Sequence, residues 1–162
     1  MIVEAENSSH YGPIRRILTE AFPSLAEANL VEQLRRDGAA RIALVATQDG
    51  RVIGYVAFSE MRAPFRALGL APVAVAADQR GRGIAAALIS AGLAQAKAGG
   101  WEAVFVLGDP AYYRRFGFRA DAAAGFDSPY AGPHLMALAL TGAGLPVRSG
   151  RIDYAPAFAS LD

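Results

Sequence analysis

The chain has 162 residues, 53% of them hydrophobic and 19% charged, so it is expected to fold as a single domain over residues 1–162 rather than stay disordered. Its 16 basic and 15 acidic residues give a net charge of +1, which excludes the basic surface typical of nucleic-acid-binding domains. Because there is no cysteine, the sequence also excludes disulfides, thiolate nucleophiles and cysteine-ligated metals.

The N-terminal quarter predicts a short strand and two helices. Residues 2–5 can form the strand, and apolar residues at helical spacing follow over 13–22, with a proline suited to the first turn. Ser24 and Glu27 have the spacing of a capping box, in which each side chain accepts from the other residue's backbone N–H. We therefore expect a second helix that begins there and ends at Gly38.

The middle of the chain predicts a mixed sheet. The pair 49–50, Asp-Gly, separates two β-rich runs and is typical of a type I′ turn, so these runs form an antiparallel hairpin. The next apolar run, 68–77, contains Pro72, which cannot donate a ladder hydrogen bond and marks an edge or a place where pairing opens. A helix over 84–98 and a strand over 102–107 then complete a βαβ crossover, whose two strands are parallel.

The C-terminal third is harder to interpret. The pair 109–110, Asp-Pro, can open a short helix that Gly117 closes. Residues 119–134 are too rich in alanine, glycine and proline to predict an element. Strands are expected at 135–140 and at 151–154.

Nothing in the sequence predicts export or a membrane span. Glu4 and Glu6 stand where a signal peptide would need a basic and then an apolar segment. The longest stretch without charged residues, 128–147, is broken by prolines and glycines. We therefore expect a cytoplasmic protein that does not bind membranes.

The sequence Gly81-Arg82-Gly83 stands between a predicted strand and a predicted helix. Glycines let the backbone approach a ligand closely, and the unpaired N–H groups at a helix start favour a phosphate. A turn that needs glycine for its shape alone is the simpler alternative. No Gly-Lys-Ser/Thr follows, which excludes a P-loop, but the spacing from Gly81 to Ala86 also satisfies a dinucleotide-binding fingerprint.

A longer pattern carries a family resemblance. The segment 78–88, with Arg80, Gly83 and Ala85 at the defined positions, resembles the acetyl-CoA motif of the GNAT superfamily of N-acetyltransferases. The segment 113–118, in which a tyrosine stands four residues before Gly-Phe, resembles the second motif of that superfamily. The likeness spans most of the chain and is greatest to the bacterial YhbS-type group.

The resemblance implies a fold and a cofactor. The fold is an α/β (α+β) domain in which a mixed, mainly antiparallel, twisted sheet is flanked by helices, and a splayed pair of parallel strands holds the cofactor. The cofactor is acetyl-CoA, and no metal is implied. The implied cofactor-binding residues are Val73, Ala74, Val75, Arg80, Gly81, Arg82, Gly83, Ile84, Ala85, Ala86, Gly108, Asp109, Tyr113 and Phe116.

The resemblance also implies catalytic groups. Tyr113 is the candidate general acid, because a phenol with a pKa near about 10 is protonated at neutral pH; the alternative is an aromatic residue that only packs. The candidate base is Glu27 or Glu60, although a helix cap and a strand-end surface charge explain these two without catalysis. A backbone amide in 73–75 would stabilise the oxyanion. His134 is a further residue that could face the acceptor.

The function implied is transfer of an acetyl group from acetyl-CoA to a primary amine by direct attack in a ternary complex. The acceptor is a small molecule or a protein amine, a homodimer is expected, and arginines 114–115 could attract an anionic acceptor or the cofactor's phosphates. Two alternatives stay open: a non-catalytic module that binds or senses acyl-CoA, and a dinucleotide-binding protein.

Overall fold

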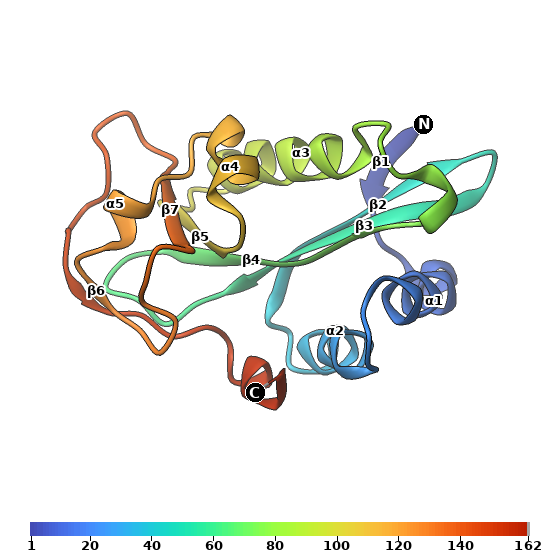
Figure 1. Cartoon of the computed structure of the whole chain (residues 1–162), viewed down its shortest axis with the longest axis horizontal. Coiled ribbons are helices and arrows are strands. Elements are labelled where there is room, and N and C mark those ends of the chain that lie inside the picture. The colour runs from blue at the N-terminus through green and yellow to red at the C-terminus, as the bar shows by residue number, and fades with distance from the viewer. Residues whose placement is uncertain (162) are drawn as a thin grey trace.

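A computed structural model describes residues 1–161, in which a twisted six-stranded sheet is the central element (Figure 1). Only β4 and β5 run parallel, and every other neighbouring pair in this sheet is antiparallel. The expectation of a mixed, mainly antiparallel sheet is therefore confirmed. In spatial order the strands are β1 Ile2–Ala5, β2 Ala40–Gln48, β3 Arg51–Glu60, β4 Ala67–Val75, β5 Ala103–Leu107 and β7 Leu135–Ala139.

Helices cover both faces of the sheet, as the family resemblance implies. The long helix α3, Ile84–Ala98, lies on one face, whereas α1, Tyr11–Ala21, and α2, Ala26–Arg36, lie on the other (Figure 1). Each face has its own buried cluster: Phe58 and Leu88 pack on the α3 side, and Leu18, Val31 and Val45 pack beneath α1 and α2. The sheet is thus a rigid, buried partition between two helical layers.

The predicted hairpin is present, and the predicted capping box is wrong. Asp49 and Gly50 both have positive φ angles, 52° and 78°, as a type I′ turn requires. At α2, however, the Ser24 hydroxyl accepts a hydrogen bond from the N–H of Ala26 at 3.2 Å, and the Glu27 carboxylate does not return to the helix start. The serine is satisfied two residues along the chain, so the Glu27 side chain is released for another role.

Strands β4 and β5 separate partway along their length. They pair only from Ala67–Gly69 to Ala103–Phe105, although β4 continues to Val75. Beyond the paired part, the Ala71–Pro72 peptide bond is cis, and the register of β4 against β3 shifts at the same level. The opened pairing expected at Pro72 is therefore confirmed, and β4 presents an unpaired edge beyond Gly69.

The C-terminal third supplies short elements around this opening. Those elements are α4 Pro110–Tyr113, the 3₁₀ turn Arg114–Phe116, α5 Ala120–Ala123, β6 Phe126–Asp127, β8 Gly150–Arg151 and the 3₁₀ helix Pro156–Leu161. Two further 3₁₀ turns, Ser8–His10 and Ala77–Gln79, lie earlier in the chain. The strand expected at 151–154 is shorter than predicted, because its remaining backbone contact is a single bridge between Asp153 and Arg62. No helix among residues 1–161 is both long and apolar enough to cross a membrane.

Candidate functional site

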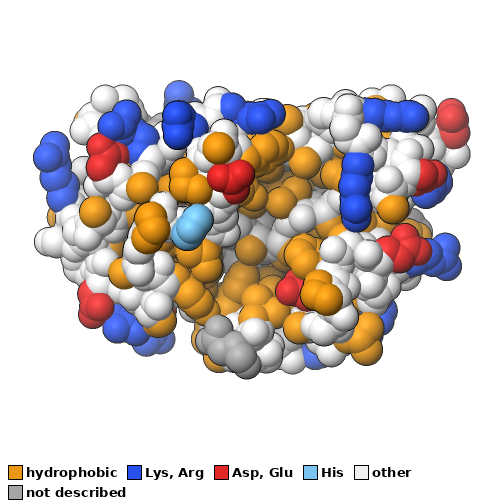
Figure 2. Space-filling model, in the orientation of Figure 1, with side chains coloured by type: hydrophobic (Ala, Val, Ile, Leu, Met, Phe, Trp, Pro, Cys, Tyr) orange, Lys and Arg blue, Asp and Glu red, His pale blue; other side chains and the backbone are white. Residues whose placement is uncertain are grey.

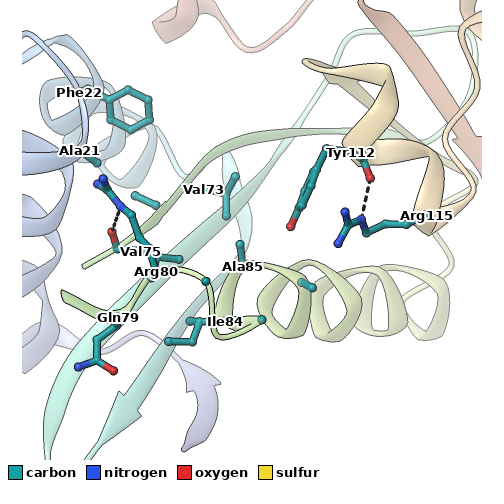
Figure 3. Close-up of a pocket in the computed structure, with 14 residues that line it drawn as sticks. Ala21, Phe22, Val73, Val75, Gln79, Arg80, Ile84, Ala85, Tyr112 and Arg115 are labelled. Carbon is teal, nitrogen blue, oxygen red and sulfur yellow. Dashed lines mark hydrogen bonds between the residues drawn. The ribbon is translucent and has the colours of Figure 1, made fainter. Parts of the chain in front are cut away.

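A groove of about 600 Å³ follows the unpaired edge of β4 (Figure 3). It lies between the end of α1, the start of α3 and the short helix α4, so three separate parts of the chain form its walls. The residues that line it are Ala21, Phe22, Val73, Ala74, Val75, Gln79, Arg80, Gly81, Gly83, Ile84, Ala85, Ala86, Tyr112 and Arg115.

One end of the groove is the glycine turn that leads into α3. Gly81 and Gly83 have φ angles of +78° and +77°, a left-handed conformation that glycine adopts without strain. An added Cβ at either position would meet no atom within 4 Å, so the backbone is open on its ligand side. No side chain caps the first turn of α3. The turn therefore offers free N–H groups and the positive end of a helix to an anion.

Charged side chains hold and surround this turn. Arg51, in the hairpin, forms a two-pronged ion pair with Asp78 at 2.8 and 2.9 Å, and the guanidinium lowers the pKa of that carboxyl to about 2. Arg80 reaches into the groove, where its Nε donates to the Val75 carbonyl oxygen at 3.4 Å (Figure 3). Arg82 lies outside the groove lining and donates to Gln79 at 3.2 Å.

The backbone of β4 turns unused polar groups toward the groove. Ala76 donates its N–H to Ile53 in β3 at 2.8 Å. Because residues of an antiparallel pair alternate between bonded and non-bonded positions, the N–H groups of Val75 and Val73 face away from β3. The bond from Arg80 to the carbonyl of Val75 confirms that direction. Two amides are thus available along the open edge.

Two neighbouring tyrosines of α4 face different cavities. Tyr112 lines the groove, where Arg115 packs over its ring at 4.3 Å, so a second arginine faces Arg80 across the groove (Figure 3). Tyr113 instead lines a second cavity, and its ring packs edge-on against Phe118 with the centroids 5.9 Å apart. Burial, with a smaller contribution from Tyr112, raises the pKa of the Tyr113 phenol above its ordinary value.

The second cavity, of about 270 Å³, brings Tyr113 and Glu27 together. It joins the groove at Phe22 and Val73, which line both. Oε1 of Glu27 is buried and has no hydrogen-bond partner in the described part of the chain. An acceptor left unpaired in this way is costly for a folded protein, and a hydrogen-bond donor on a bound ligand would remove that cost. Its lining residues are Phe22, Glu27, Leu30, Leu70, Ala71, Pro72, Val73, Leu107, Tyr113 and Leu161.

Several residues singled out in the sequence lie elsewhere. Glu60 is exposed at the end of β3 and forms an ion pair with Arg41 at 2.9 Å, outside both cavities. Asp109 caps α4 by accepting from the N–H of Ala111 at 3.0 Å. Gly108 donates its N–H to the carbonyl of His134 at 3.0 Å, and the ring of that histidine is exposed.

Sequence reasoning missed other lining residues. Phe22 was counted only among the apolar residues of 13–22, and Tyr112 was not singled out, whereas both line the groove. Phe116, by contrast, packs against the two tyrosine rings without lining either cavity. Within residues 1–161, no group of three or more acidic or histidine side chains could hold a metal ion.

Comparison with known proteins agrees with this geometry. Residues 11–118 match the model of the Acetyltransferase (GNAT) family. The uncharacterised N-acetyltransferase YhbS of Escherichia coli K12 is 44% identical over 126 residues, which cover 75% of each chain.

Two solved structures are similar over nearly the whole chain. The crystal structure of YhbS from Escherichia coli in complex with CoA has a TM-score of 0.91 and 36% identity, and covers 98% of this chain and 91% of that one. A GNAT family acetyltransferase from Brucella melitensis in complex with acetyl-CoA has a TM-score of 0.83 and 33% identity, with 97% of each chain covered.

Proposed function

The chain belongs to the GNAT family of acetyltransferases, and we propose that it transfers the acetyl group of acetyl-CoA to a primary amine by direct attack within a ternary complex. The observation that carries the proposal is the continuity of the site. A groove that begins at an anion-binding turn and follows an unpaired strand edge opens into a cavity that holds a phenol and an unpaired carboxylate.

The groove fits the shape and charge of acetyl-CoA. The amides of residues 80–86, with Arg80 and Arg115 on opposite sides, would hold the diphosphate at one end. The outward-facing carbonyl of Val73 and N–H of Val75 would bond the amide groups of the pantetheine arm, as an added strand would, which leaves the N–H of Val73 free for the reaction centre. The thioester would then lie at the junction with the second cavity. When bound, acetyl-CoA supplies an activated acetyl group, whose C–S bond breaks as the C–N bond to the amine forms.

Tyr113 is proposed as the general acid. Its phenol lines the second cavity, and because burial raises its pKa, it keeps its proton at neutral pH. A proton held there can pass to the departing thiolate. The amide of Val73, which lines both the groove and the cavity, is the candidate donor to the oxyanion.

Glu27 is proposed as the group that accepts the proton of the amine. Glu27 lines the same cavity as Tyr113, and its Oε1 is buried without a hydrogen-bond partner among residues 1–161, so a carboxylate and a phenol would both be within reach of an acceptor bound there. A carboxylate there would also attract the ammonium form of the acceptor before deprotonation. Glu60 has no place in this proposal, because its carboxylate is engaged by Arg41.

The test measures thiol release from acetyl-CoA over a panel of primary amines, with mass spectrometry of the product and calorimetry of CoA binding. We expect CoA to bind and thiol release to depend on the added amine. CoA binding without acetylation of any amine would favour a non-catalytic acyl-CoA module instead. Binding of NAD in preference to CoA would favour the dinucleotide-binding alternative. The cytoplasmic location, the single domain and the homodimer stay predictions.

A further inference from the structure

A third cavity, of about 260 Å³, lies next to the one that holds Glu27 and Tyr113. The two cavities share Leu70 and Leu161 among their lining residues, so they are adjacent, and a ligand that spans both would contact these side chains. The volume is slightly below the range of roughly 300–1,000 Å³ typical of drug-sized ligands. A single ring or a short chain is therefore the size of group that it suits.

Aromatic side chains from the C-terminal part of the chain form the far wall. The rings of Tyr154 and Phe158 lie 5.2 Å apart, and Tyr130 packs edge-on to Tyr154 at 5.6 Å. Tyr154 lies directly over Gly69, where an added Cβ would overlap its ring. Phe158 packs against Leu30 in α2, which fixes the C-terminal 3₁₀ helix beside that helix (Figure 1). The wall is thus firmly packed.

The third cavity is lined by apolar and neutral side chains. Among the described residues, no charged side chain lines it. The buried Tyr154 hydroxyl has no hydrogen-bond partner in the part of the chain that the structure describes. Burial, followed by the nearby phenols of Tyr130 and Tyr113, raises its pKa, so it stays neutral. Within residues 1–161, Glu27 is the one carboxylate that lines the two joined cavities.

These observations limit the acceptor. One carboxylate can compensate one ammonium group, and a second ammonium group in the aromatic cavity would lose its hydration without a partner. The space-filling view shows hydrophobic side chains along the walls of the central hollow on this face (Figure 2). Polyamines and aminoglycosides carry several ammonium groups and therefore do not match this surface.

Building on the proposed function, we propose that the acceptor is a small monoamine whose body is an aromatic ring or a short alkyl chain. The amino group lies between Glu27 and Tyr113, and the body fills the cavity formed by Tyr130, Tyr154 and Phe158. Glu27 sets where the amine reacts, and the aromatic cavity selects which amine is accepted.

The test uses amines that differ by a single charge. Hexylamine and hexamethylenediamine have the same chain, but the second carries another ammonium group at its far end. Phenethylamine supplies a ring in place of the chain. We expect kcat/KM for hexylamine and for phenethylamine to exceed that for the diamine at least about tenfold, because an unpaired charge is costly to desolvate.

A pair of variants tests whether the body of the amine lies in the aromatic cavity. Leu161→Asp adds a carboxylate at the rim of the cavity, and should shift the preference toward the diamine by about tenfold or more. Val147→Asp adds the same charge at another exposed apolar position, outside the two cavities, and should leave the preference unchanged. The folding of both variants is checked by thermal melting.

Failure of this inference and failure of the proposed function give different results. Turnover of the diamine as fast as that of hexylamine would overturn the inference and leave the acetyltransferase function intact. Binding of hexylamine to the CoA-saturated protein, with no acetylation once acetyl-CoA replaces CoA, would overturn the function and support the cavity. If hexylamine and phenethylamine neither bind nor react, the aromatic cavity is not an acceptor site.

Discussion

The two halves of the site are built in different ways. The cofactor groove takes most of its lining from one continuous segment, 73–86, and offers mainly backbone groups and a helix start. The acceptor cavities bring together side chains from α2, β4, the loop at Tyr130 and the C-terminal 3₁₀ helix. When one segment supplies the backbone groups of a site, its residues form a local pattern in the sequence. Side chains that come from distant segments form no such pattern. The first half should control cofactor affinity, and the second should control rate and acceptor choice.

The largest expected effect tests whether the acceptor half controls rate. Tyr113→Phe keeps the ring and its contact with Phe118 but removes the phenolic proton. We expect the single-turnover rate on the preformed acetyl-CoA complex to fall by about 10²–10⁴-fold, with CoA affinity near that of the parent. Tyr11→Phe, at a ring stacked by Arg35 outside the site, is the control. A Tyr113→Phe rate within about threefold of the parent would remove Tyr113 from the mechanism.

A slightly smaller effect is expected at the other proton-transfer group. Glu27→Gln keeps the size of the side chain but removes its capacity to accept a proton, so the single-turnover rate should fall by about 10²-fold while CoA still binds. Glu32→Gln, on the same helix but exposed and paired with Arg15, should change neither quantity. Equal rates for the two variants would contradict the assignment of Glu27 as the base.

The third prediction tests the cofactor half. Gly83→Val places a branched side chain in a left-handed turn, and we expect CoA affinity by calorimetry to fall at least about tenfold. The left-handed conformation lowers the folding stability by about 1–2 kcal/mol when the residue is not glycine. Gly38→Val provides the matched control, since its φ of +67° and open surroundings are similar but it lies outside the groove. The two variants should lose similar stability, and only Gly83→Val should lose affinity.

The smallest effect concerns the ion pair that holds the glycine turn. Because Arg51 lowers the pKa of Asp78 to about 2, this pair stabilises the fold above the ordinary carboxyl pKa of 3.8 and is lost as the pH falls toward 2. In Asp78→Asn the melting temperature should therefore depend less on pH between about 4 and 2. The difference from the parent should be small, because exposed ion pairs contribute little to stability. CoA affinity should also weaken a little, whereas Asp121→Asn, at another exposed pair, should leave it unchanged. Identical CoA binding by both variants would show that the turn does not depend on Arg51.

How far the sequence predicts the molecule follows the same division. Local sequence predicts three features correctly. The helical period of the apolar residues predicts the helix 84–98, the Asp-Gly dipeptide predicts the hairpin at Asp49, and the missing N–H donor predicts the opening at Pro72. Residues 119–134 carry no such local pattern, because tertiary contacts rather than propensity determine where their short elements form. The capping box failed for a related reason, since Ser24 had a nearer partner.

The candidate site was predictable where one segment builds it. Which of two adjacent tyrosines faces the groove depends on the rotation of α4, and the sequence does not reveal that rotation. The sequence does not distinguish Glu27 from Glu60 as the candidate base. The structure does, because Glu60 forms an ion pair with Arg41, whereas Oε1 of Glu27 has no partner among residues 1–161. The wall formed by Tyr154 and Phe158 has no motif, because it comes from a segment far from the others in sequence.

The parting of β4 from β5 beyond Gly69 and Phe105 has a kinetic consequence. The cofactor groove and the acceptor cavities meet at that gap and, among the described residues, share only Phe22 and Val73, so we expect each substrate to enter and leave from its own side. Neither occupant needs to pass through the space of the other. With substrates placed as proposed, both orders of addition lead to the same complex, and each product can depart by the route through which its precursor arrived.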